Sequence, residues 1–289
     1  MNKKAVKLLL KLFFTTLALY LVFRKIDTET TLAIVKGASP FYLFLALLLF
    51  ILSKIFSAVR LNYFFRDLGL ILPTVQNLRL YGIGMFYNLF LPGGIGGDGY
   101  KVFLLNKFYK TPVKPLLQAV LLDRLNGLAV LVFLMLVLVF GVDITLFSAA
   151  DIKIIAIVAL LLLAIGFYGM MRLFFPAFMA STGITLAYSF FVQITQLACA
   201  YLILLALGIH TQILEYQFLF LVSSVVAVLP LTIGGVGARE LVFILSHDYM
   251  GIDENAAVAF SLLFFLITAF TSLAGIFLKF RKKQDDVHS

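Results

Sequence analysis

The chain has 289 residues, of which 63% are hydrophobic and 13% charged, and its mean hydropathy is +1.08. Soluble domains hold about 45–50% apolar and about 25% charged residues, so this composition predicts an all-α integral membrane protein without a sizeable soluble domain. The net charge is +9, and the basic residues behind it lie at the ends of apolar segments. This distribution argues against nucleic-acid binding and for contact with anionic lipid headgroups. The single cysteine, Cys199, excludes an intrachain disulfide and a cysteine-based metal site.

Eight apolar segments follow one another along a single membrane domain, residues 1–289. Six are long enough for a full crossing, which takes about 20 residues; they are 6–23, 41–60, 117–140, 152–171, 184–207 and 255–278. Two shorter runs, 74–91 and 214–229, each lead into proline and clustered glycines. Such runs are typical of re-entrant or broken helices, although two half-spans that together complete one crossing would fit as well.

The basic residues predict the orientation of the chain, because cytoplasmic ends of membrane helices carry an excess of Lys and Arg. With the N-terminus in the cytoplasm, the outer ends carry only Arg24, Lys25, Lys36 and Lys153. The cytoplasmic ends carry Lys3, Lys4, Lys7, Lys11, Arg60, Arg66, Lys107, Lys110, Lys114, Arg172, Lys279, Arg281, Lys282 and Lys283. We therefore expect both termini, including the tail 281–289, on the cytoplasmic side of the cell (inner) membrane.

A motif occurs twice, at residues 91–101 and 229–239, with the same leucine, proline, isoleucine and three glycines in register. The offset is 138 residues (229 − 91), and it also carries the spans of the first half onto those of the second. We expect repeat 1 at about 1–141 and repeat 2 at about 142–280. Each contains three full crossings, an odd number, so the second should sit upside down as an inverted-topology repeat. Chance similarity of two glycine-rich loops is the alternative.

The motifs suggest an anion site at the start of a short helix. Proline ends the preceding helix, and new helices are expected near 99–106 and 237–247. Free amides at a helix start favour anions, and Lys101 and Arg239 fall in those first turns. Such a site would suit a phosphate headgroup; the alternative is that the glycines serve helix packing alone. A nucleotide-binding loop is excluded, since that fingerprint needs a preceding strand.

Ionisable side chains at membrane depth are costly and are usually functional or paired. Asp98 is expected to pair with Arg124 or Lys101, and Asp123 or Asp98 could meet Arg239 across the axis between the repeats. Structural ion pairing is the alternative for each. Lys54 is expected to snorkel to the cytoplasmic surface, and Gln193 and Gln196 could line a cavity or join helices. The candidate substrate-binding residues are Asn88, Gly96, Gly97, Asp98, Lys101, Asp123, Arg124, Gly234, Gly235, Arg239 and Glu240.

The two motifs, together with the sequence Leu-Asp-Arg-Leu-Asn-Gly at 122–127, resemble the lysylphosphatidylglycerol synthase transmembrane-region family, also called the flippase-like domain family. The resemblance covers nearly the whole chain. In the multiple peptide resistance factor proteins of this family, the membrane domain is joined to an aminoacyl-transferase domain and moves lysyl-phosphatidylglycerol between leaflets. Only eleven residues follow Leu278 here, so the resemblance implies a stand-alone membrane domain that handles lipid and is not an aminoacyl transferase.

The function expected from these features is movement of a phospholipid or glycolipid headgroup between leaflets. No enzyme activity, catalytic residue, cofactor or metal site is expected, because no HExxH motif, His/carboxylate cluster or Ser/His/Asp spacing is present. Two alternatives remain. One is an ion-coupled or small-solute secondary transporter, and the other is a non-transporting membrane partner of an envelope lipid or glycan enzyme. The expected partners are lipids with charged or glycosylated headgroups, and a homo-oligomer or an envelope-enzyme complex is compatible with the sequence.

Overall fold

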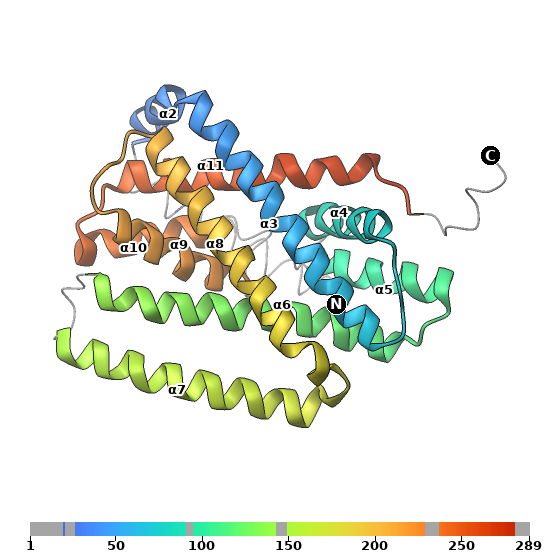
Figure 1. Cartoon of the computed structure of the whole chain (residues 1–289). Coiled ribbons are helices and arrows are strands. Elements are labelled where there is room, and N and C mark those ends of the chain that lie inside the picture. Colours follow the sequence, from blue (N-terminus) through green and yellow to red (C-terminus); the bar gives the residue numbers. More distant parts are fainter. Residues whose placement is uncertain (1–19, 21–26, 91–94, 143–148, 229–236, 281–289) are drawn as a thin grey trace, which may run out of the picture.

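The computed structural model describes residues 20, 27–90, 95–142, 149–228 and 237–280, and in these parts all regular structure is helical (Figure 1). The all-α prediction is confirmed. The helices are α2 (Thr28–Gly37), α3 (Pro40–Asp67), α4 (Thr74–Phe90), α5 (Gly96–Tyr109), α6 (Val113–Leu138), η1 (Val139–Gly141), α7 (Ala149–Phe174), η2 (Pro176–Ser181), α8 (Thr182–Ala206), α9 (Ile213–Val228), α10 (Ala238–Met250), α11 (Glu254–Leu273) and η3 (Ala274–Phe277).

Five helices are long and apolar enough to cross a bilayer, and they contain the predicted spans 41–60, 117–140, 152–171, 184–207 and 255–278 almost completely. They have 24 to 31 residues, more than the roughly 20 that one crossing needs. The sixth predicted span, 6–23, lies outside the described residues apart from Tyr20. Helix α7 exposes Leu161, Leu162 and Ile165, an apolar surface suited to lipid and unsuited to water. The chain is a multi-pass membrane protein.

The short run 74–91 forms α4, which pairs antiparallel with α5 as a helical hairpin. At the open end, the Tyr109 hydroxyl donates to Oε1 of Gln76 (2.7 Å). At the tip, the Gly97 amide donates to Oδ1 of Asn88 (2.9 Å). Helix α5 is longer than the predicted 99–106, since it begins at Gly96, inside the glycine cluster, and ends at Tyr109.

The run 214–229 forms the corresponding hairpin of α9 and α10. At its open end, Nε2 of Gln212 donates to the carbonyls of Met250 (3.2 Å) and Gly251 (3.0 Å). Helix α10 runs from Ala238 to Met250, close to the predicted 237–247. The connecting residues 229–236, which hold most of the second motif, lie outside the described residues.

Helices α3 and α8 lie side by side and antiparallel (Figure 1). The Ser39 amide, just before α3, donates to the Ala206 carbonyl at the end of α8 (2.8 Å). At the opposite end, the Ser181 hydroxyl donates to the Asp67 carboxylate. Each hairpin follows the C-terminal end of one of these helices, so the hairpin α4–α5 and the hairpin α9–α10 approach the middle of the protein from opposite ends.

The helix boundaries and contacts repeat at the predicted offset of 138. Added to the bounds of α4, 74–90, it gives 212–228, against Ile213–Val228 for α9. The pairing of α4 with α11 has its counterpart in that of α9 with α6, so each hairpin packs on the long helix of the other half. This geometry is what an inverted repeat requires; the arrangement of the repeats in a bilayer and the total number of spans remain predictions.

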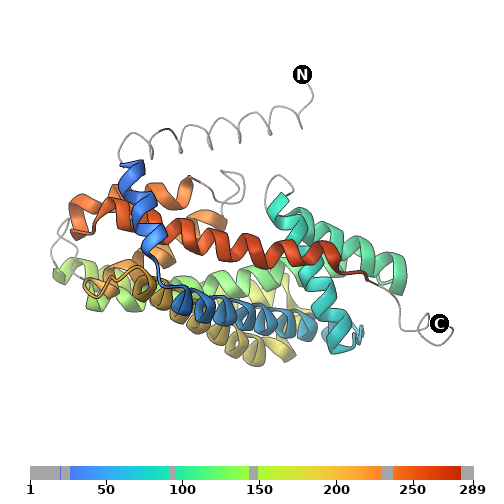
Figure 2. The same ribbon diagram turned by 90° about the horizontal axis from the view of Figure 1, so that it is seen from above.

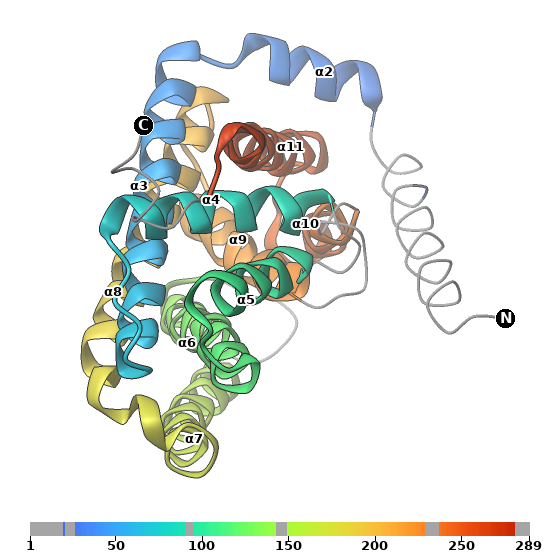
Figure 3. The same cartoon turned by 90° about the vertical axis from the view of Figure 1, so that its right-hand side faces the viewer.

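Several helices pack around this pair of hairpins. In Figure 3, α3 and α8 lie along one side, α4 crosses the view between α11 and α5, and α7 lies at the periphery. Helix α2 packs on α11 (Figure 2), where Oδ1 of Asn255 accepts from the Asp27 amide (3.0 Å) and the Thr31 hydroxyl (3.2 Å). Aromatic contacts join the halves, for example Phe50 of α3 with Phe264 of α11 (ring centroids 5.7 Å apart).

Candidate functional site

A polar cavity of about 300 Å³ lies where α3, α4, α5, α6 and α8 meet the end of α9. Its polar lining residues are Lys54, Ser57, Arg60, Tyr81, Asn88, Asp98, Lys101, Asp123, Arg124, Gln193 and Gln196. The cavity therefore gathers five of the predicted site residues, from the first hairpin and from α6. We call it the central cavity.

Asp98, in the first turn of α5, is held between two cations. One carboxylate oxygen lies 2.8 Å from Nζ of Lys101, one turn further along α5, and the other binds Nε of Arg124 on α6. Lys101 Nζ also lies over the Tyr81 ring, 4.7 Å from its centroid. Both predicted partners of Asp98 are thus confirmed. The consequence is that Lys101 is neutralised by Asp98 and is not a free cation for a headgroup.

A second ion pair, Arg60 with Asp123, crosses from α3 to α6 at 2.7 Å. Nη1 of Arg60 also donates to the Ser189 hydroxyl (2.8 Å), which donates to Oδ1 of Asn126 (2.7 Å). The prediction that Arg60 lies at the cytoplasmic surface is wrong, because its guanidinium is buried among these partners. Asp123 and Asp98 are also not paired with Arg239. Each is satisfied by a cation nearer to it.

The glycines of the first motif bring α4 and α5 into unusually close contact. A Cβ on Gly97 would lie 1.9 Å from the Gly84 carbonyl oxygen, and a Cβ on Gly84 would lie 2.2 Å from Cε of Lys101. Gly96 begins α5 beside them. The Gly97 amide is used by Asn88, and the amides of residues 98 and 99 bond the carbonyl of residue 95. The predicted backbone anion site is therefore largely occupied by the protein's own acceptors, and these glycines serve packing.

Beside the second motif, Glu240 caps the start of its own helix, whereas Asn88, beside the first motif, accepts from the neighbouring helix. Oε2 of Glu240 accepts from the Gly237 amide (2.7 Å) at the start of α10, and its Oε1 accepts from the Ser261 hydroxyl of α11 (2.8 Å). Both oxygens are thus engaged, one in capping α10 and the other in joining α10 to α11. The Arg239 guanidinium lies over the Phe264 ring, 5.3 Å from its centroid. The predicted glycines Gly234 and Gly235 lie outside the described residues.

The family model for the lysylphosphatidylglycerol synthase transmembrane region matches residues 8–275, almost the whole chain. The chain belongs to this family. It is also similar to the UPF0104 membrane protein PH1989 of Pyrococcus horikoshii, with 26% identity over 328 aligned positions that cover 96% of this chain and 98% of the relative. The match to that relative is consistent with a stand-alone transmembrane domain.

The position of Lys54 differs from the one predicted from the sequence. Lys54 lines the central cavity, and its Nζ lies 4.4 Å from the centroid of the ring of Phe50, one turn nearer the N-terminal end of α3 and so away from the end predicted to be cytoplasmic. The expected snorkelling to the cytoplasmic surface is therefore wrong. Lys54 falls near the middle of α3, and that depth is the signal that could have indicated an interior position.

Gln193 and Gln196 of α8 also line the central cavity, and Gln193 leaves one polar atom available. Its Nε2 donates to the Gly127 carbonyl (3.2 Å) on α6. Its Oε1 is buried and has no hydrogen-bond partner among the described residues. Buried acceptors normally have a partner, so this oxygen is a candidate contact for a donor on a ligand.

The lining of the central cavity has more cations than carboxylates. Four basic side chains face two acidic ones, which leaves a surplus of two positive charges (4 − 2). Three of the basic groups are bound in the two ion-pair clusters described above. Among the described residues, Lys54 has no carboxylate within salt-bridge distance. A cavity of this kind in a membrane protein favours an anionic ligand.

Proposed function

We propose that this protein moves a phospholipid or glycolipid from one membrane leaflet to the other, with the headgroup passing through the central cavity. The observation that carries the proposal is the surplus of positive charge there, with Lys54 facing the cavity without a carboxylate partner among the described residues. A cation at membrane depth is costly unless a counter-ion accompanies it. A lipid phosphate would supply that counter-ion.

The size of the central cavity supports a headgroup as the ligand. At about 300 Å³ it is at the lower end of ligand pockets, which hold about 300–1,000 Å³. A headgroup would occupy it while the acyl chains stay in the bilayer.

The same proposal places the protein in the cell (inner) membrane with both termini in the cytoplasm, and it assigns transport and not catalysis. The orientation rests on the Lys and Arg distribution, which keeps its bias after Arg60 is moved to the interior. The membership of the family supports lipid handling. Transport would run downhill or be coupled to an ion gradient.

Proteoliposomes that contain fluorescent phosphatidylglycerol or phosphatidylcholine test the proposal. A membrane-impermeant reductant removes only the outer-leaflet signal, about half of the total in unilamellar vesicles without protein. In vesicles with the reconstituted protein, we expect the reductant to remove more than this signal, because labelled lipid from the inner leaflet reaches the outer one. Folded protein, verified by a sharp thermal transition, that moves no lipid class would overturn the proposal.

A further inference from the structure

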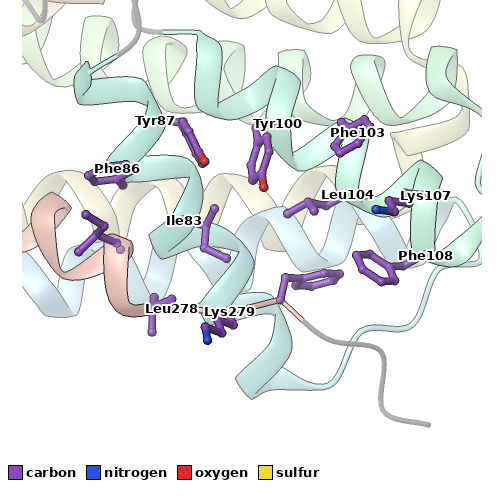
Figure 4. Close-up of a pocket in the computed structure, with 13 residues that line it drawn as sticks. Ile83, Phe86, Tyr87, Tyr100, Phe103, Leu104, Lys107, Phe108, Leu278 and Lys279 are labelled. Atoms are coloured by element: carbon purple, nitrogen blue, oxygen red, sulfur yellow. The ribbon is translucent and has the colours of Figure 1, made fainter. Parts of the chain in front are cut away.

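A second cavity lies on the other face of the α4–α5 hairpin (Figure 4). On α4, Tyr81, Met85 and Asn88 face the central cavity, whereas Ile83, Phe86 and Tyr87 line the second one. The hairpin thus forms a wall between a charged chamber and a groove of about 440 Å³. We call the second cavity the aromatic groove.

Besides α4, two segments line the aromatic groove, and they are fixed against each other. One is α5, with Tyr100, Phe103, Leu104 and Phe108. The other is the chain that follows α11, residues 275–280. The Phe280 ring contacts the rings of Phe108 (5.7 Å between centroids) and Tyr109 (6.4 Å). These contacts hold the chain after α11 along α5, so the groove is part of the fold.

Close packing of two glycines fixes the inner end of the aromatic groove. A Cβ on Gly275 would lie 2.3 Å from the Gly82 carbonyl oxygen, and a Cβ on Gly82 would lie 2.6 Å from a methyl of Leu278. Helix α4 and the end of α11 therefore approach as closely as their backbones allow. The Tyr87 and Tyr100 rings lie nearby, with centroids 4.3 Å apart and planes tilted by 43°, and add aromatic surface to the groove.

The charge of the aromatic groove indicates its ligand. Its thirteen lining residues include two lysines, Lys107 and Lys279, and no carboxylate. Both lysines are exposed, and the Lys107 ammonium lies over the rings of Phe103 (6.0 Å) and Phe108 (5.7 Å). Aromatic and aliphatic side chains with two cations at the rim match an amphipathic molecule that carries a negative charge.

We propose that the aromatic groove binds one anionic phospholipid, with an acyl chain along Phe86, Tyr100 and Phe103 and the phosphate at Lys107 and Lys279. The groove lies at the cytoplasmic ends of α5 and α11 in the predicted orientation, where such lipids are abundant. The site is distinct from the central cavity. It stands whether or not the protein transports lipid, because it requires binding only.

Lipid nanodiscs with a phosphatidylglycerol that carries a photoreactive group in its acyl chain test this site. We expect cross-links to peptides of α5 and of residues 275–280. The double variant Lys107→Gln/Lys279→Gln should reduce these cross-links by at least fivefold, because one lysine near an anionic surface contributes about fivefold in affinity. Photoreactive phosphatidylcholine should label the groove less than phosphatidylglycerol does.

The matched control is Lys110→Gln/Lys114→Gln, which removes the same charge from exposed positions at the same end but outside the groove. We expect this control to keep wild-type cross-linking. An equal loss in both double variants would show that only surface charge attracts the lipid and would overturn the site. The same holds for cross-links that avoid the groove, or for equal labelling by both lipids.

Discussion

At the scale of residues, three of the four cations that line the central cavity are paired with carboxylates, and Lys54 is the one that could bind a ligand. Arg60, Lys101 and Arg124 are bound to Asp123 and Asp98. Lys54 faces the same cavity with an aromatic ring beneath its ammonium and no carboxylate among the described residues within salt-bridge distance. A headgroup phosphate would therefore gain most from Lys54.

The variant Lys54→Gln tests this role. A hydrogen bond to a charged group contributes about 1.5–3 kcal/mol, so we expect headgroup binding to weaken by about tenfold or more. The measurement is the concentration dependence of lipid movement in proteoliposomes. Lys114→Gln, an exposed position outside both cavities, is the control and should behave as wild type. An unchanged dependence in Lys54→Gln would contradict the role of this lysine.

Asp98 has a different part, because it neutralises two cations at once. Asp98→Asn leaves Lys101 buried with a weaker partner, and breaking a buried ion pair costs about 3–5 kcal/mol. We expect a clear fall in the temperature of unfolding, measured by thermal shift in detergent. The double variant Asp98→Asn/Lys101→Met should recover part of the loss, since it removes one of the stranded charges. Equal stability of Asp98→Asn and wild type would contradict the account.

The pairing of Asp98 was predictable because its partners are close in sequence or lie at a similar depth. The pairing of Asp123 was not. Its partner Arg60 was counted as a surface residue, and only the antiparallel packing of α3 on α8 beside α6 brings them together. The position of a residue along a membrane-spanning helix indicates its depth in the bilayer, but it does not indicate which neighbouring helix the side chain faces. Lys54 was also assigned to the surface, although its place near the middle of α3 could have indicated an interior position.

At the scale of elements, the α4–α5 hairpin is the part that both cavities share. The repeated proline and glycines predicted a break followed by a short helix, and both features are present. The sequence did not show that the amides of the glycine motif, predicted to bind an anion, are already hydrogen-bonded within the protein. The amides bond to Asn88 and to the carbonyl of residue 95, contacts that depend on how closely α5 approaches α4.

Gly97→Ala tests this close approach. Its Cβ would lie 1.9 Å from a backbone oxygen of α4, so the hairpin must open. Overpacking of this kind costs about 1–3 kcal/mol, and we expect a lower unfolding temperature together with slower lipid movement. Gly99→Ala is the matched control two residues away, where a Cβ meets open space. It should be neutral or slightly stabilising, because alanine favours a helix more than glycine does. The same loss in both variants would argue against the close contact.

At the scale of the whole molecule, the bounds of the two hairpins and of the helices around them match at an offset of 138, while the arrangement of the two repeats in a bilayer stays a prediction. Because α3 and α8 are antiparallel, the hairpins approach from opposite ends. The sequence led to the same expectation through an odd number of spans per half, a count that stays a prediction. It did not predict how each hairpin packs on the long helix of the other half, since such contacts join residues far apart in the chain.

Single cysteines test which side of the membrane each hairpin opens to. The native Cys199 is buried and gives little background labelling. Lys114→Cys lies beside the open end of the first hairpin and Thr211→Cys beside that of the second, and both positions are exposed. In intact cells, an impermeant maleimide should label Thr211→Cys and should label Lys114→Cys only after the membrane is opened. Labelling of both from the same side would contradict the inverted arrangement.

The proposed function requires that a lipid headgroup enters the central cavity. A phosphatidylglycerol with a photoreactive group on its headgroup, incorporated in nanodiscs and mapped by mass spectrometry, tests it most directly. We expect cross-links to the residues of α3 and α8 that line the central cavity, at and around Lys54, Gln193 and Gln196, with about tenfold less labelling in Lys54→Gln. Cross-links confined to the lipid-facing surface, or equal labelling of Lys54→Gln, would contradict it.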